Sequence, residues 1–269
     1  MLNAAQVSQF ARDGYIKTGR MIDEAWVAEL RAEVLRVIAD EGTGKPQPVS
    51  LSKWDVDGAV IYQICNIWEA STAFRRLITH APILDAAGQL LGARELRVWH
   101  DQIQYKPAQT GGVNRWHQDW PYWPILSGPT QVTAWIALDD ADDGNGCMSM
   151  VPGSHRWGNQ IDFLHTIKEI DDMPAEHQGH ALAVRRCPVG AGEVHFHHGL
   201  TWHGSHANVS GRPRRAIAIH LMSEQTRFVA SGNHLMKPHV TVADGEVIAG
   251  EHFPLVWSTP AEVASLAGA

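Results

Sequence analysis

The stretch LRVWHDQIQYKP, residues 96–107, marks the point where the chain changes from helical to strand-like patterning. Apolar and polar residues alternate along much of it, and three later segments have the same texture: TQVTAWIALDD, GEVHFHH and RRAIAIHLMS. Turn-forming residues separate these segments, most clearly in DGNG at 143–146. Short strands that follow a helical section predict a mainly β protein, a sandwich or barrel buttressed by helices.

About the first 95 residues favour helices rather than strands. Apolar residues recur every four places from 22 to 38, with Asp23 as a cap at the start and Gly42 as the end of the helix. Pro82 is placed to open a later helix that Gly92 ends. These helices are expected to pack against the β core rather than to carry chemistry.

No low-complexity linker divides the chain, so we expect one domain spanning 1–269. The expected parts are a helical N-terminal part at about 1–95, a β core at about 96–222 and a C-terminal extension at about 223–269. Within the extension, VADGEVIAG favours a hairpin around Asp244 and Gly245.

Composition limits the partners. The net charge is -7 with scattered lysines and arginines, which argues against a nucleic-acid partner. No apolar run approaches the ~18 residues of a membrane span, and the N-terminus lacks a signal-peptide pattern. Three widely separated cysteines, Cys65, Cys147 and Cys187, suggest neither a disulfide framework nor a zinc ribbon, so a cytoplasmic protein is expected. The sequence carries no signal for oligomeric state.

The segment RWHQDWPYWP, residues 115–124, suggests a metal site. On an extended strand His117 and Asp119 would point to one face while Gln118 points away. His203, in HHGLTWHGSHANVSGRPRR, is the best third ligand. Two histidines and one carboxylate on one face of a metal are typical of non-haem Fe(II) oxygenases, whereas zinc usually takes four ligands, or three and a water.

Simpler interpretations stay open for several residues. His117 and Asp119 taken alone would equally suit a hydrogen-bonded structural pair. His197, His198 and His220 suit either partners that orient ligands or plain filling of the barrel. His155 suits either the edge of a substrate pocket or a loop histidine bound to its own backbone. The aromatic residues of this segment suit either a pocket wall or the core; they are Trp116, Trp120, Tyr122 and Trp123.

The combined pattern is more specific. H-x-D, followed about eighty-five residues later by H-G-S and by an arginine eleven places beyond that histidine, resembles the phytanoyl-CoA dioxygenase family. The resemblance extends through WHDQIQYKP, QVTAWIALDDADDGNGCMSMVPGSH and GEVHFHHGLTWHGSHAN, about residues 96–222. It implies a double-stranded β-helix, a jelly-roll of cupin-like type, with the N-terminal helices as its buttress.

The resemblance also implies the roles of eight residues. The family's iron ligands fall on His117, Asp119 and His203. Its contacts to 2-oxoglutarate fall on Arg214, Ser205, Trp135, Gln102 and Gln63. Among these, Arg214 matches the arginine that holds the distal carboxylate, and a guanidinium fork suits that group.

Strand periodicity bears on two of these residues. Along RRAIAIHLM, Arg214 shares a face with Ala216, Ala218, His220 and Met222, which leaves room for a ligand. Along LRVWHDQIQY, Gln102 is expected to share a face with Leu96, Val98, His100 and Gln104.

The implied activity is that of an Fe(II)- and 2-oxoglutarate-dependent dioxygenase. It would hydroxylate an unactivated C–H bond of a small molecule with O2, releasing succinate and CO2, and ascorbate is an expected stimulant. Related halogenases replace the carboxylate ligand by a small residue, and Asp119 is present here, which favours hydroxylation, or another oxidative outcome such as desaturation, over halogenation. The alternatives are a zinc-dependent hydrolase on a cupin-like barrel, which leaves Arg214 and Ser205 without a role, and a non-catalytic protein that binds a metal or 2-oxoglutarate.

Overall fold

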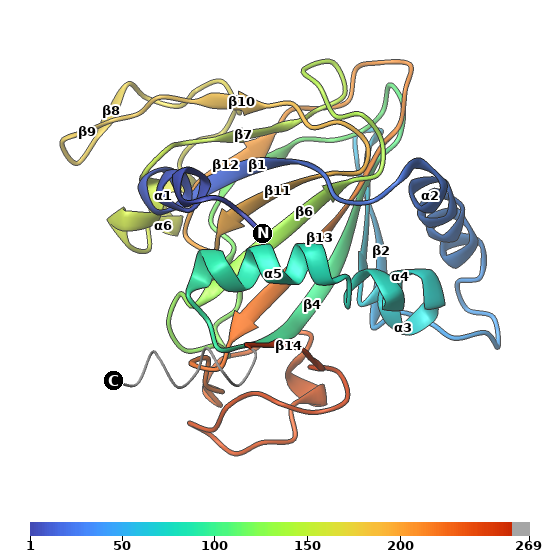
Figure 1. The fold of residues 1–269 in the computed structure, drawn as a ribbon. Helices are drawn as coiled ribbons and strands as arrows, with labels where there is room; N and C mark the ends of the chain where they lie inside the picture. Colours follow the sequence, from blue (N-terminus) through green and yellow to red (C-terminus); the bar gives the residue numbers. More distant parts are fainter. Residues whose placement is uncertain (260–269) are drawn as a thin grey trace.

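A computed structural model describes residues 1–259 as two antiparallel sheets with helices outside them (Figure 1). The larger sheet contains, in spatial order, β1 (Tyr15–Arg20), β11 (Glu193–His198), β6 (Gln131–Ala137), β13 (Arg214–Ser223), β4 (Glu95–Lys106), β3 (Ala59–Cys65) and β2 (Ser50–Val56), and β14 (Leu255–Ser258) also pairs with β4. The smaller sheet contains β10 (Arg185–Cys187), β7 (Met148–Met150), β12 (His203–Ser205) and β5 (Asn114–His117). The fold is the expected mainly β jelly-roll with a cupin-like core.

Helices and short elements complete the chain. The helices are α1 (Ala4–Asp13), α2 (Glu24–Ala39), α3 (Ile67–Ala70), α4 (Thr72–Leu77), α5 (Ala81–Leu91) and α6 (Ile161–Leu164). The 3-10 turns are η1 (Trp120–Tyr122), η2 (Ser154–Trp157) and η3 (Lys237–His239), and β8 (Glu176–His177) pairs with β9 (His180–Ala181). No helix among residues 1–259 combines the length and apolar character that crossing a bilayer requires.

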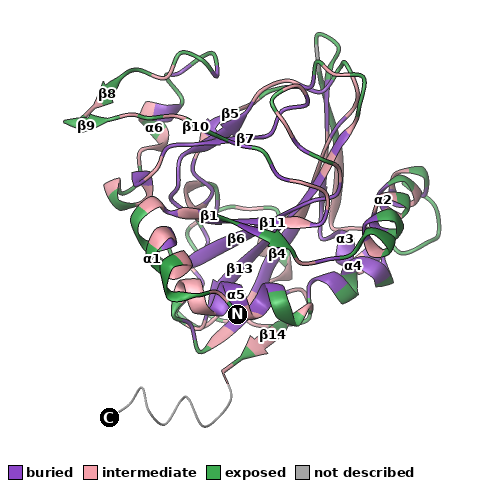
Figure 2. Cartoon of the chain, turned by 45° about the horizontal axis from the view of Figure 1, so that its top comes forward, coloured by how far each residue is buried: buried purple, intermediate pink, exposed green. Residues whose placement is uncertain are grey.

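The main hydrophobic core lies between the N-terminal helices and the outer face of the larger sheet. Leu30 and Val34 of α2 belong to the same cluster of buried side chains as Ile217 and Ile219 of β13. Figure 2 shows the result: the strands of the larger sheet are mainly buried, while the helices expose their outward faces. Burial of these apolar side chains is the main stabilising contribution to the sheet.

The predicted helix ends are largely reproduced. The Asp23 side chain accepts the amide of Trp26 at 2.8 Å and begins α2. Pro82 lies in the first turn of α5, and Gly92 ends it with a left-handed φ of 59°. The prediction for Gly42 is wrong, because α2 already ends at Ala39, with Asp40 at the cap position.

The N-terminal part is not purely helical as expected, because β1, β2 and β3 lie within it. β2 and β3 form a hairpin whose turn residues Asp57 and Gly58 have positive φ values of 54° and 81°. An Asp-Gly pair is a strong hairpin signal. The hairpin predicted at Asp244 and Gly245 is also wrong: Gly245 turns with φ 81°, but no strand flanks it.

A bulge in β4 changes which residues face the inside of the sandwich. The register between β4 and β13 shifts between His220 and Leu221, opposite Trp99. Leu96 and Val98 therefore lie in the outer core, while Gln102 lies on the inner face. The prediction that Gln102 shares a face with Leu96 and Val98 is thus wrong. The extra residue in β4, Trp99, reverses the in-and-out alternation between these two parts of the strand.

Candidate active site

One cavity of about 790 Å³ lies between the two sheets. Residues of both sheets line it, with Trp135 and Arg214 from the larger and Met148 and His203 from the smaller. All eight residues that the resemblance singled out contribute to its wall. Segments up to about 150 residues apart in the chain are thereby brought to one space.

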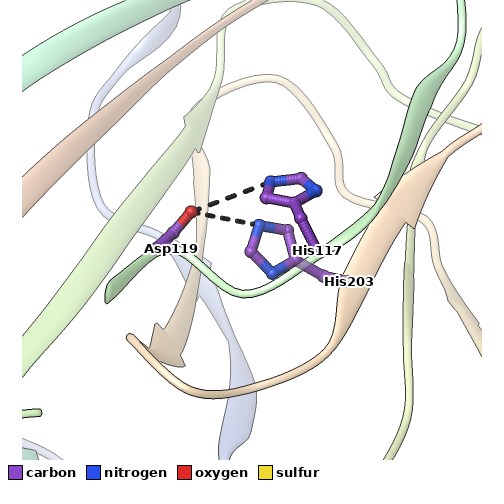
Figure 3. A group of neighbouring side chains, drawn as sticks. All are labelled: His117, Asp119 and His203. Carbon is purple, nitrogen blue, oxygen red and sulfur yellow. Dashed lines mark ion pairs between the residues drawn. The ribbon is translucent and has the colours of Figure 1, made fainter. Parts of the chain in front are cut away.

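Three side chains converge in this cavity, as Figure 3 shows. Asp119 Oδ1 lies 3.8 Å from His117 Nε2 and 3.4 Å from His203 Nε2. Candidate ligand atoms from all three residues lie within 4.8 Å of one another. His117 and His203 face each other as direct partners across β5 and β12, with ring centroids 4.0 Å apart. Two imidazoles and one carboxylate on one side, with the cavity beside them, fit an Fe(II) ion.

Backbone carbonyls fix the orientation of both imidazoles. Nδ1–H of His117 donates to the carbonyl of Arg115 at 2.7 Å, and Nδ1–H of His203 donates to that of Thr201 at 2.9 Å. A carbonyl only accepts, so each Nδ1 carries the proton. Each Nε2 can then keep its lone pair for a metal.

Asp119 reaches the site differently from the prediction. β5 ends at His117, and Asp119 has helical backbone angles at the start of η1. The convergence therefore comes from a turn and not from strand alternation. Gln118 does point away: its amide donates to the carbonyls of Leu200 and Gly158 at 2.7 and 2.9 Å, and this fixes the turn.

The second oxygen of Asp119 is held by its surroundings. Asp119 Oδ2 accepts the hydroxyl of Thr133 at 2.9 Å and Nε2–H of His197 at 3.1 Å. Thr133 Oγ1 in turn accepts Nδ1–H of His220 at 2.7 Å. These bonds occupy Oδ2 and leave Oδ1 free on the side that faces His117 and His203. His197 and His220 thus orient a candidate ligand, whereas His198 and His155 do not line the cavity.

The electrostatics favour charged Asp119 and neutral His117. Burial, together with neighbouring His203, lowers the pKa of His117 to about 3. Burial would raise the pKa of Asp119, but His203 and His197 outweigh it and hold that pKa well below its usual range. For His203 burial is outweighed by Asp119, which raises its pKa. A metal requires a carboxylate and deprotonated imidazole nitrogens. The Asp119 carboxylate that favours a proton on His203 would equally favour a metal cation at this position.

Arg214 is buried beside the triad without an anionic partner. It is 1% exposed, and its guanidinium donates to the carbonyl of Gln104 at 3.2 Å and to Ser205 Oγ at 3.5 Å. Its Nε has no partner, and no carboxylate of residues 1–259 forms an ion pair with it. The guanidinium carbon lies 5.6 Å from the ring centre of Trp135. Burial lowers the pKa of Arg214 to about 10, so it remains a cation at neutral pH.

Lys106 is a buried basic residue next to Arg214 that the sequence analysis missed. It is 0% exposed, and its Nζ donates to Ser205 Oγ at 2.7 Å and to the carbonyl of His206 at 2.6 Å. Lys106 and Arg214 therefore share Ser205 Oγ, with no carboxylate of the described chain paired to either. The sequence signal for Lys106 is its place at the end of β4, two residues after Gln104 and four after Gln102, which both line the cavity. An anion bound beside Arg214 would offset the cost of this unpaired buried charge.

The remaining predicted residues lie in the cavity wall with differing contacts. Gln102 Oε1 accepts Nε2–H of Gln104 at 3.3 Å. Gln63 Oε1 accepts the indole N–H of Trp54 at 3.0 Å, so this residue holds a tryptophan at the cavity wall. Of the aromatic residues of the 115–124 segment, Trp116, Tyr122 and Trp123 line the cavity and Trp120 does not.

Fold and site together define a jelly-roll protein with a two-histidine, one-carboxylate cluster in the same cavity as a buried arginine. Residues 10–216 match the phytanoyl-CoA dioxygenase family, PhyH. The chain belongs to this family. An ectoine dioxygenase from Bordetella parapertussis is 27% identical over 239 residues, which cover 80% of this chain and 74% of that protein.

Solved structures agree with this assignment. The non-haem alpha ketoglutarate dependent carbocyclase SnoK from nogalamycin biosynthesis superposes with a TM-score of 0.79 at 29% identity, covering 95% of this chain and 97% of that one. The epimerase SnoN, solved with Fe3+, alpha ketoglutarate and nogalamycin RO, has a TM-score of 0.76 at 25% identity, covering 94% and 98%. The protein is an iron- and 2-oxoglutarate-dependent dioxygenase.

Proposed function

We propose that this single-domain enzyme holds Fe(II) with His117, Asp119 and His203, binds 2-oxoglutarate against Arg214, and hydroxylates a C–H bond of a small molecule. One observation carries the proposal. The three ligand atoms converge within 4.8 Å in the same cavity where Arg214 is buried without an anion. A bound diacid would supply the missing negative charge at the arginine end.

When bound, iron and 2-oxoglutarate supply the oxidising chemistry: O2 provides one oxygen atom to the substrate hydroxyl and one to succinate, with loss of CO2. The chain positions these partners. Thr133 and His197 hold Asp119 Oδ2, so that Oδ1 is presented to the metal. Ser205 and Trp135 lie against the guanidinium of Arg214. Burial of this end would keep water away from the carboxylate of a bound 2-oxoglutarate.

The alternatives account for fewer observations. A zinc hydrolase needs the metal and a water but gives the buried Arg214 cation no anion to bind. Halogenation needs the carboxylate position to be open, and Asp119 occupies it. We place the enzyme in the cytoplasm, which agrees with three buried cysteines that form no disulfide.

Turnover tests the proposal. The chain is incubated with Fe(II), ascorbate, 2-oxoglutarate and a fractionated metabolite extract, and mass spectrometry follows succinate and substrate masses. We expect succinate formation coupled to a product heavier by one oxygen atom. Tightly held zinc with no succinate from any fraction would overturn the proposal and favour the hydrolase.

A non-catalytic binding protein gives a third result. Such a protein would bind 2-oxoglutarate and metal, which calorimetry would detect. It would form no more succinate than the His203→Ala variant does.

A further inference from the structure

Exposed apolar side chains gather at the outer end of the cavity. Within residues 1–259 eight large hydrophobic side chains are exposed, and four of them line this one cavity. They are Trp54 at 58%, Tyr122 at 49%, Leu235 at 47% and Val113 at 41% exposure. Each comes from a different segment, so local sequence does not explain why they line one cavity. We call these four residues the apolar rim. Apolar surface that stays exposed around a cavity indicates a binding site for apolar material.

Hydrogen bonds hold the two aromatic members of the rim in place. The indole N–H of Trp54 donates to Gln63 Oε1 at 3.0 Å, across the β2–β3 hairpin. Tyr122 Oη lies 2.9 Å from Nε2 of His165, which also lines the cavity. The polar atoms of both rings are thereby used, and their flat faces are left for contact. Rings fixed in this way bind a flat ligand with little loss of conformational entropy.

Charged groups are nearly absent from this end. Among residues 1–259 the only carboxylate in the cavity wall is Asp119, which the proposed metal site uses, so the wall offers no second carboxylate to pair with an ammonium group. Apart from the buried Arg214, the only lysine or arginine in the wall is Arg115, which is too little for the several phosphates of a coenzyme A thioester. Burial lowers the pKa of His234 to about 4, so this wall residue is uncharged at neutral pH.

The size of the cavity indicates a substrate larger than the cosubstrate. Cavities of roughly 300–1,000 Å³ hold drug-sized ligands, and this one measures about 790 Å³. A five-carbon diacid at Arg214 leaves most of that space unfilled. From rim, charge and size together, we propose that the substrate is an uncharged, flat molecule with fused rings that lies against Trp54 and Tyr122. This inference rests on the proposed function, because both use the same cavity.

Binding of three probe classes tests the substrate class. The full chain, loaded anaerobically with Fe(II) and 2-oxoglutarate, is titrated by equilibrium dialysis with 1-hydroxyanthraquinone, with L-proline and with hexanoyl-CoA. These probes represent a neutral fused-ring compound, a zwitterion and a coenzyme A thioester. We expect saturable binding of the anthraquinone alone. Tighter binding of L-proline or of hexanoyl-CoA would overturn the proposal.

Matched variants locate the binding. Trp54→Ala is expected to weaken anthraquinone binding about tenfold, which corresponds to about 1.4 kcal/mol, and Trp54→Phe to retain most of it. Leu235→Ala is expected to weaken binding, whereas Leu255→Ala is not; both leucines are 47% exposed, but only Leu235 lines the cavity. Equal effects of the two leucine variants would contradict the proposal. All four substitutions lie at exposed side chains, and circular dichroism checks folding.

Repeating the titration without metal separates this inference from the proposed function. Anthraquinone binding that persists, in a chain that binds no Fe(II) and forms no succinate, would refute the proposed function and leave the apolar rim as a binding site. Succinate formation without any anthraquinone binding would do the reverse.

Discussion

At the inner end of the cavity Arg214 is 1% exposed, whereas at the outer end Trp54 exposes 58% of its surface. The inner end buries charge that it does not neutralise, and the outer end exposes apolar surface that it does not cover. Each arrangement costs free energy in the isolated chain, since a buried charge is unpaired and apolar area stays in water. This difference is what the two proposed ligands would need: an anion at the buried arginine and an apolar ring system at the exposed rim.

The largest effect is expected at the metal site. His203→Ala removes one of the three proposed metal ligands. Turnover should fall by more than the roughly 10- to 100-fold that follows loss of a residue that only hydrogen-bonds to a ligand. Bound Fe(II) per chain and succinate formation measure it. His180→Ala is the matched control, because His180 is exposed and stacks on Trp157, outside the cavity. A His203→Ala variant with full metal content would refute the ligand role.

The next largest effect is expected for 2-oxoglutarate binding at Arg214. Arg214→Met should weaken 2-oxoglutarate binding by about 100-fold, because loss of one partner of a buried charge pair costs roughly 2–5 kcal/mol. Without 2-oxoglutarate the variant should be as stable as the parent chain or more so, since a buried unpaired charge is gone. Thermal unfolding with and without 2-oxoglutarate measures both. Unchanged stabilisation by 2-oxoglutarate would show that the carboxylate binds elsewhere.

A smaller, pH-dependent effect is expected from Lys106. Burial and the neighbouring Arg214 lower the pKa of Lys106 well below its usual value, and a bound dianion would raise it again. Binding of 2-oxoglutarate should therefore take up a proton, and the affinity should fall as pH rises, by at most about tenfold per pH unit.

Calorimetric titration in buffers of different ionisation enthalpy measures this proton uptake. Lys106→Met should bind 2-oxoglutarate more weakly and lose the pH dependence that Lys106 contributes. A pH slope that is identical in both proteins would refute the coupling.

The smallest effect is expected at the outer end. Tyr122→Phe removes only the hydroxyl that contacts His165, so anthraquinone binding should weaken by about threefold, within the range of a single hydrogen bond. Affinity for 2-oxoglutarate should not change, because Tyr122 has no contact with Arg214 or Ser205. Parallel titrations of both ligands check this. A change in 2-oxoglutarate affinity would show that the two ends are not independent.

Short-range patterns explain most of what the sequence predicted correctly. Pro82 and Gly92 delimit α5 because they act on the backbone within one helical turn. The alternation in β13 correctly placed Arg214 and Ala218 on the cavity side. Alternation failed in β4, where a bulge at Trp99 reverses it. The sequence analysis also missed the β2–β3 hairpin, although the Asp57-Gly58 pair marks its turn.

The sequence by itself determined the helix ends, the alternating strands of the core, and the chemical types from which a metal and an oxo-diacid site can be built. Only the tertiary structure decided that Thr133 and His197 hold Asp119, that Lys106 lies beside Arg214, and that the four residues of the apolar rim line one cavity. The physical reason is range. Caps, turns and alternation depend on residues a few places apart, whereas these contacts join strands and loops whose separation in the chain is bridged only when the two sheets pack.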